Sequence, residues 1–372
     1  MGKRERRLIL IFFGLVAIFY LACSKEKPIL FESQLDNIIL EIATIAPNGT
    51  YLVVNVKKDT IYTSNMPYGS PLPHVSERIA VDTKNNEYWH LMDDYIAETT
   101  ILHQVDNFAW DKNSKMALCS AALRNFPIFS VNFETRIYND LNVPWLGASG
   151  YRIPIYSYRE HEIIFFTRGI DVDTVLDTCT IVGRVAWWDT LTKKTTKIYS
   201  DTKLANINWM ILCDTNSIIL ETDGHLLSYS AITNSISSLL RDIKIEADIR
   251  ISNGKLVFIG SSIDNRRKKS LYVYDIVKKS VDYIQDAIPQ KVFYADVNKN
   301  HRYVLWTGLV GDQQIYLYSK DGRRITSFKG LTPFWLAGSD TLIYSEGKLI
   351  VKAWLDEDNR LHKTVVLKNV KK

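Results

Sequence analysis

Apolar residues along this chain come in short runs between clusters of turn-forming residues, and no amphipathic helix longer than about ten residues is predicted after residue 40. One pattern recurs, in which a turn is followed by a strand that is apolar at consecutive positions. A strand that is apolar on both sides must be covered on both faces. The pattern occurs in APNGTYLVVNV (46–56), DKNSKMALCSA (111–121), REHEIIFFTRG (159–169), CDTNSIILETDG (213–224), SNGKLVFIGS (252–261), NKNHRYVLWTG (298–308) and AGSDTLIYSEG (337–347).

Hairpins with a more alternating pattern follow several of these runs. Asp321-Gly322 lies between apolar runs in one of them, and this dipeptide is the strongest short signal for a hairpin turn. Lys278-Lys279 occupies the corresponding turn in another. The predicted hairpins cover residues 79–91, 184–199, 225–240, 270–284 and 314–328.

The apolar strands recur at intervals near 40–50 residues. Their centres lie near residues 52, 117, 164, 218, 257, 305 and 343. About four strands per interval is typical of a β-propeller, in which neighbouring blades cover both faces of each sheet. We therefore predict an all-β fold, a β-propeller of about seven four-stranded blades, with six or eight as alternatives. A two-domain β-sandwich is the alternative architecture.

The order of turn, apolar strand, Tyr-rich strand, turn and short strand resembles the TolB-type and WD-repeat-like propellers of bacterial cell envelopes. The resemblance covers residues 38–370 as an architecture. It implies that the N-terminal segment completes the last blade and closes the ring. The natural partner for that segment is HKTVVLKNV (362–370).

The N-terminus has the pattern of an export signal. Basic residues precede an uninterrupted apolar run of 15 residues, Leu8–Ala22, which is short for a permanent membrane span and has the length of a signal-peptide core. Leu21-Ala22-Cys23, followed by polar residues, resembles a bacterial lipobox, although Tyr20 stands where Leu is commonest. This resemblance implies lipidation of Cys23. An uncleaved N-terminal anchor is the alternative.

These features predict three regions and a location. Residues 1–22 are a signal peptide, 23–37 a lipid-anchored tether and 38–372 the propeller domain. The protein then resides in the cell envelope as a membrane-anchored lipoprotein that faces the periplasm or the cell surface.

The net charge of the chain disfavours nucleic acid as a partner, and two of its cysteines are expected in the core. The chain has 372 residues and a formal net charge of +5, and removal of four basic and one acidic residue with the first 22 leaves +2. A nearly neutral body of this size has no electrostatic footprint for nucleic acid. Of the four cysteines, Cys119 and Cys213 lie in apolar runs and are expected in the core.

Catalytic signatures are missing from the sequence: it contains no GxSxG, HExxH, P-loop or GxGxxG motif, and its seven histidines form no HxH or HxxxH pair. We predict no catalytic residue, no metal site and no cofactor. Two segments are candidates for partner contacts. One is the basic loop Arg266, Arg267, Lys268 and Lys269, for which a solubilising role is the alternative. The other is Trp187-Trp188, for which core packing is the alternative.

The predicted function is an extracytoplasmic scaffold that binds or assembles a protein partner and associates with the membrane through its lipid. The alternatives are a propeller that binds glycan or peptidoglycan fragments and an enzyme with a site in the propeller channel. Fold alone does not decide among these functions.

Overall fold

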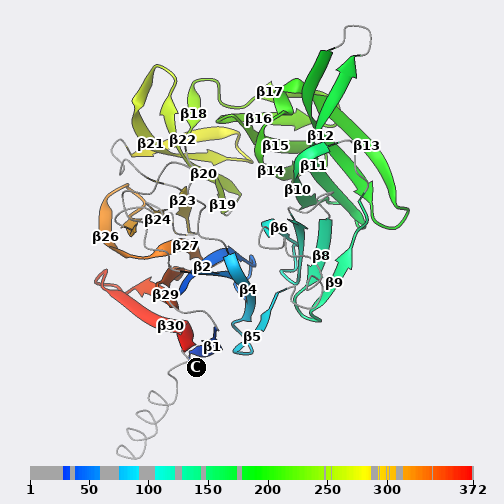
Figure 1. Ribbon diagram of the computed structural model, residues 1–372. Coiled ribbons are helices and arrows are strands. Elements are labelled where there is room, and N and C mark those ends of the chain that lie inside the picture. Colours follow the sequence, from blue (N-terminus) through cyan, green and yellow to red (C-terminus); the bar gives the residue numbers. More distant parts are fainter. Residues whose placement is uncertain are drawn as a thin grey trace, which may run out of the picture.

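Seven β-sheets stand in a ring around a central axis in the computed structural model (Figure 1). This arrangement is a seven-bladed β-propeller, and the predicted fold class is confirmed. The structure describes residues 28–33, 38–58, 75–91, 105–121, 128–143, 148–173, 178–246, 249–252, 254–285, 292, 294–298, 300, 302–306, 313–336 and 338–370.

The first four blades each contain four consecutive strands, ordered from the axis outward as in the sequence. Blade 1 is formed by β2 (Ile38–Ile45), β3 (Tyr51–Lys58), β4 (Val75–Asp82) and β5 (Glu87–His90). Blade 2 is formed by β6 (Val105–Trp110), β7 (Met116–Ala121), β8 (Ile128–Asn132) and β9 (Ile137–Asp140). Blade 3 is formed by β10 (Ala148–Tyr156), β11 (Glu162–Asp173), β12 (Thr178–Asp189) and β13 (Lys194–Asp201), and the short 3-10 helix η1 (Thr202–Leu204) follows it. Blade 4 is formed by β14 (Ile207–Asp214), β15 (Ser217–Thr222), β16 (His225–Ser230) and β17 (Ser235–Ser238).

The last three blades keep this plan with two changes. Blade 5 divides its inner strand into β18 (Ile243–Ile245) and β19 (Arg250–Ser252), followed by β20 (Lys255–Ser262), β21 (Asn265–Asp275) and β22 (Ser280–Gln285). Blade 6 is formed by β23 (Tyr294–Val297), β24 (Tyr303–Trp306), β25 (Gln314–Tyr318) and β26 (Arg324–Lys329). Blade 7 is formed by β27 (Leu331–Trp335), β28 (Leu342–Glu346), β29 (Leu349–Leu355) and β30 (Leu361–Val370), with β1 (Ile29–Glu32) added at its outer edge.

Each predicted apolar strand is the second strand of a blade. These strands are β3, β7, β11, β15, β20, β24 and β28, one in every sheet. In β3, the consecutive residues Leu52, Val53 and Val54 are all fully buried. The double burial follows from the position of the strand, because a neighbouring blade lies on each side of it.

Seven hydrophobic clusters make up the described core, and each of them joins two adjacent blades. In β7, Ala117 and Cys119 pack toward blade 1, whereas Leu118, between them, packs toward blade 3. Trp187 and Trp188 divide in the same way, with Trp187 in the cluster shared with blade 4 and Trp188 in the cluster shared with blade 2. Alternation along a strand therefore distributes apolar side chains to both interfaces.

The ring closes through the N-terminal strand. β1 pairs in parallel with β30, with Ile29 opposite Leu367 and Glu32 opposite Val370. Phe31 is fully buried in the cluster between blades 7 and 1, and its ring meets Tyr88 of blade 1 edge-on at a centroid distance of 5.2 Å. The pairing agrees with the partner implied by the resemblance, and it places residues 29–32, within the segment expected as a tether, in the propeller.

The turns of the blades divide between two ends of the ring. Since every blade begins at the axis and its strands alternate in direction, the turns between strands one and two and between strands three and four lie at the same end. We call this end the turn face. In the described part of the chain, no helix has the length and apolar character that a bilayer crossing needs.

Candidate binding cleft

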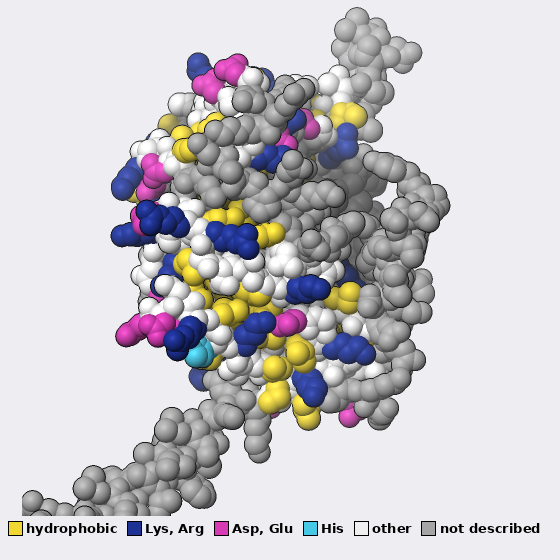
Figure 2. Space-filling model, turned by 90° about the vertical axis from the view of Figure 1, so that its left-hand side faces the viewer, with side chains coloured by type: hydrophobic (Ala, Val, Ile, Leu, Met, Phe, Trp, Pro, Cys, Tyr) yellow, Lys and Arg dark blue, Asp and Glu magenta, His cyan; other side chains and the backbone are white. Residues whose placement is uncertain are grey.

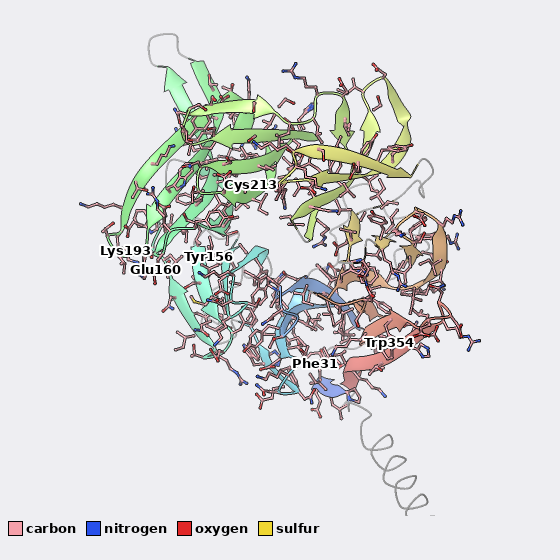
Figure 3. All side chains as sticks on the ribbon, turned by 180° about the vertical axis from the view of Figure 1, so that it is seen from behind. Phe31, Tyr156, Glu160, Lys193, Cys213 and Trp354 are labelled. Atoms are coloured by element: carbon pink, nitrogen blue, oxygen red, sulfur yellow. The ribbon has the colours of Figure 1, made fainter. Side chains whose placement is uncertain are left out.

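The first strands of blades 2, 3 and 4 border a large hollow. β10 contacts β6 and β7 of blade 2 on one side and β14 of blade 4 on the other. The cleft has a volume of about 1200 Å³ and is lined in part by the first turns of blades 2 and 3, so it lies toward the turn face. Figure 3 labels two of its residues, Tyr156 and Glu160, and Cys213 on the adjoining blade.

Aromatic and aliphatic side chains make up most of the cleft wall. The aliphatic ones include Ile155, Met210 and Leu212, which come from β10 and β14. Such a lining favours apolar groups of a ligand, because it removes them from water. The aromatic residues of the wall are Phe108, Trp110, Tyr156, Tyr158 and Trp209.

Two of these aromatic residues are fixed by hydrogen bonds to neighbouring blades. The Tyr158 hydroxyl donates to the backbone carbonyl of Cys213 at 3.1 Å and so joins the first turn of blade 3 to β14 of blade 4. Trp110 Nε1 donates to Thr44 Oγ1 of blade 1 at 3.0 Å. The cleft is therefore preorganised by contacts between blades.

Two half-buried carboxylates of the cleft are used by the turns that carry them. Asp111 Oδ1 accepts the backbone N–H groups of Lys115 at 2.8 Å and Met116 at 2.9 Å. Glu162 Oε2 accepts the Ser157 hydroxyl at 2.7 Å. Both carboxylates therefore shape the rim of the cleft.

The exposed rim carries charge of both signs. The side chains of Arg159 and Glu160 are 81% and 90% exposed, respectively, and His161 Nε2 lies 3.7 Å from Glu160 Oε1. Lys112 lies on the opposite wall, in the first turn of blade 2. The rim can pair with either charge on a ligand, and exposed pairs of this kind contribute specificity more than affinity.

The Tyr156 hydroxyl is the buried polar group of the cleft that has no hydrogen-bond partner within the described structure. Burial raises the pKa of this hydroxyl, and the nearby Asp111 and Cys119 raise it further. The phenol therefore stays protonated at physiological pH. It is a buried hydrogen-bond donor whose oxygen is closed off from solvent.

A second polar group lies on the inner strands of blades 5, 6 and 7. Burial raises the pKa of Asp296 in β23 to about 6, although the charge of Arg250 in β19 lowers it. The Arg250 guanidinium lies 4.5 Å from the ring centroid of Phe334 in β27. This group is a buried acid with a nearby cation, and Ile251, next to Arg250 in β19, also lines the cleft.

The described side chains among the residues selected from the sequence lie on different blades, Trp187 and Trp188 on blade 3 and Lys269 on blade 5. Trp187 and Trp188 are only 8% and 4% exposed, so we do not place a partner surface on these rings. The prediction of a loop at Arg266 to Lys269 is wrong, because these residues belong to β21, and Lys269 Nζ lies 4.0 Å from Glu246 Oε2. The side chains of Arg266, Arg267 and Lys268 lie outside the described residues, as does Cys23.

The described side chains form no group of three or more His, Cys, Asp or Glu residues that could hold a metal ion. The described histidines lie on different blades, at residues 90, 161, 225 and 362. Cys119 is a free and buried thiol, and Cys213 is a free and partly buried one. Burial raises the pKa of the Cys213 thiol to about 11, which disfavours the reactive thiolate.

Sequence reasoning missed the cleft residues. Trp110, Tyr156 and Trp209 end or lie within first strands, and each comes from a different blade. Their signal was positional: each lies close before the turn that leads into an apolar strand. Without the curvature of the ring, that position does not show which three blades meet at a cleft.

No protein-family model and no curated protein sequence matches the chain. Solved structures do share its fold. An oligogalacturonate lyase from Vibrio parahaemolyticus is 10% identical, with a TM-score of 0.59, over 87% of this chain and 93% of that chain. The acylaminoacyl peptidase of Pyrococcus horikoshii is 12% identical, with a TM-score of 0.54, over 88% of this chain and 52% of that chain. TolB from Acinetobacter baumannii is 12% identical, with a TM-score of 0.45, over 77% of this chain and 61% of that chain. At these identities the likeness concerns the fold.

Proposed function

We propose that this protein is a lipid-anchored, extracytoplasmic propeller that binds an extended segment of a protein partner in the cleft between blades 2 and 4. The cleft, with its aliphatic floor, its aromatic walls and its rim of mixed charge, is the observation that carries the proposal. The protein acts as a binding or assembly scaffold.

The lining favours a peptide over a small molecule or a sugar. A volume of about 1200 Å³ exceeds the range of about 300–1,000 Å³ that is typical of small-molecule pockets. Ile155 and Leu212, which are partly exposed, offer aliphatic contacts that suit apolar side chains.

The anchor is proposed from the sequence of residues 1–28. If Cys23 is lipidated, Cys23→Ala releases the protein from membranes or leaves an uncleaved precursor. Unchanged membrane fractionation of the variant, together with no lipid label on the wild type, would contradict the anchor without touching the cleft.

Photocrosslinking tests the cleft directly. We expect a photoreactive side chain in place of Ile211, which lies in β14 and lines the cleft, to capture a defined protein segment in membranes, and mass spectrometry identifies that segment. A synthetic peptide of the captured sequence then measures affinity. Trp209→Ala should weaken its binding by about tenfold or more, as expected for an aromatic group central to an interface.

Trp354→Ala is the matched control, because Trp354 is 39% exposed on the outer part of blade 7, away from the cleft. It should leave peptide affinity unchanged, and circular dichroism checks that both variants remain folded. Crosslinks to glycan, turnover of a substrate, or equal binding by the two variants would each overturn the proposal of a peptide-binding cleft.

A further inference from the structure

The turns between the third and fourth strands have one architecture in blades 1 to 5. A residue at the end of the third strand accepts hydrogen bonds from backbone N–H groups of the turn. Asp82, Asn132, Asp189 and Asp275 each accept two such bonds, at 2.8–3.0 Å, and Ser230 accepts one at 3.4 Å. Four residues after the acceptor, the backbone has positive φ at Asn86, Arg136, Lys193, Asn234 and Lys279.

The tip residue, two positions after the acceptor, differs between blades. It is Lys84 in blade 1 and Glu134 in blade 2. In blades 3, 4 and 5 it is Leu191, Ile232 and Val277, which are 67%, 76% and 84% exposed. We call these three residues the apolar tips. Because the turn forms equally well around polar residues, folding does not account for their apolar character.

The apolar tips are held at fixed positions on the turn face. The residue before each tip donates its backbone N–H to the first turn of the same blade. Thr190 donates to His161 O at 2.7 Å, Ala231 to Asn216 O at 2.6 Å and Ile276 to Gly254 O at 3.2 Å. Three adjacent blades therefore present one apolar side chain each from a braced turn.

Lysines flank two of the three apolar tips. Lys193 and Lys194 follow Leu191, and Lys278 and Lys279 follow Val277. Figure 3 shows Lys193 at the same edge of the ring as Glu160, which belongs to the first turn of blade 3. Apolar groups beside lysines match a membrane surface, where the apolar groups enter the acyl boundary and the lysines meet anionic headgroups.

We propose that the turn face of blades 3 to 5 docks on an anionic membrane surface, with Leu191, Ile232 and Val277 inserted at the headgroup boundary. The occupant is a lipid surface rather than a protein, because the apolar tips protrude singly from separate blades and line no groove. Docking is restricted to the turn face. On the described outer surface of blades 5 to 7, Figure 2 shows Lys and Arg spread among Asp and Glu.

The direction of β1 supports an orientation with the turn face toward the membrane. β30 starts at the turn face, and β1 runs parallel to it, so Ile29, the first residue of β1, lies toward the turn face. An anchor at Cys23, which rests on the proposed function, would hold blade 7 near the membrane while the apolar tips hold the opposite part of the ring. The cleft would then face the headgroups and receive a segment of a membrane protein.

Depth-dependent quenching tests the docking without any protein partner. The full chain, reconstituted in vesicles, receives one fluorescent side chain at position 191, 232 or 277, and spin-labelled lipids act as the quencher. In phosphatidylglycerol vesicles, we expect quenching at each apolar tip to exceed that at the control position 84 by about twofold or more. Lys84 is the matched control, because blade 1 has the same turn with a polar tip.

A second comparison tests what the lysines contribute to membrane docking. Exchange of Lys193, Lys194, Lys278 and Lys279 for Ser, or replacement of phosphatidylglycerol by phosphatidylcholine, should reduce quenching at the apolar tips. Equal quenching at positions 84 and 277, the same quenching in both lipids, or quenching that appears only after a partner protein is added would overturn the proposal. None of these results bears on peptide binding in the cleft, so the two proposals fail separately.

Discussion

Blades 1 and 2 and blades 3 to 5 share a turn but differ in the surface that the turn carries. Ten of the thirteen large hydrophobic residues that are exposed in the described structure lie between Tyr158 and Tyr283, on blades 3 to 5. The three others are Leu30, Ile137 and Trp354. The core shows no such division, because each interface between adjacent blades has its own hydrophobic cluster.

This difference shows that the fold of the turn and the surface chemistry of its tip have separate causes. The acceptor residue and the positive-φ residue are needed to form the turn, and blades 1 to 5 all have them. Where the acceptor is Asp or Asn, its bond to the tip residue uses only the backbone N–H of that residue, so the side chain can vary with function. Comparison among the blades of one ring thus separates folding from surface chemistry within a single chain.

The largest expected effect separates buried from exposed apolar residues within blade 3. Phe166 is 2% exposed in the cluster between blades 3 and 4, so Phe166→Ala should lower the free energy of unfolding by about 3–5 kcal/mol. Leu191→Ala in the same blade should change it by no more than about 0.5 kcal/mol. Urea unfolding followed by circular dichroism measures both values. A comparable loss in Leu191→Ala would show that the apolar tip is structural.

The next effect concerns the buried Asp296, whose contribution to stability changes with pH. Burial raises the pKa of Asp296 from 3.8 to about 6, so the stability linked to its neutral form is present below pH 3.8 and is lost as the pH rises through about 6. Relative to Asp296→Asn, the wild type should lose about 3 kcal/mol between about pH 4 and pH 7, as measured by urea unfolding at each pH. A difference between the two proteins that does not vary with pH would contradict this assignment.

The sequence predicted the parts of the fold that depend on local pattern. Both faces of β7 and β20 are apolar in the sequence because both are buried, and this double burial, repeated at intervals near 40–50 residues, indicated a ring of packed sheets. The pair Trp187-Trp188 was ambiguous for the same reason, since adjacent rings on a strand can serve two interfaces or one exposed surface. The cleft could not be predicted, because Trp110 and Trp209 meet only through the curvature of the ring. The apolar tips were visible as Leu, Ile and Val within polar turns, but their exposure required the structure.

The smallest effect tests whether the turn and its tip are independent. Hydrogen bonds from the backbone N–H groups of Lys278 and Val277 lower the pKa of Asp275, so the ionised carboxylate stabilises the turn at neutral pH and loses that contribution as the pH falls below about 4. Asp275→Ser copies the acceptor of blade 4, Ser230, which does not titrate. We expect the variant to be slightly less stable than the wild type at about pH 7 and to approach it at about pH 3, as measured by thermal unfolding. Quenching by spin-labelled lipid at position 277 should persist in the variant at neutral pH, because the apolar tip and its lysines remain. If that quenching disappears while the fold is retained, the acceptor and the tip act as one unit, and the separation of folding from surface chemistry would not hold for blade 5.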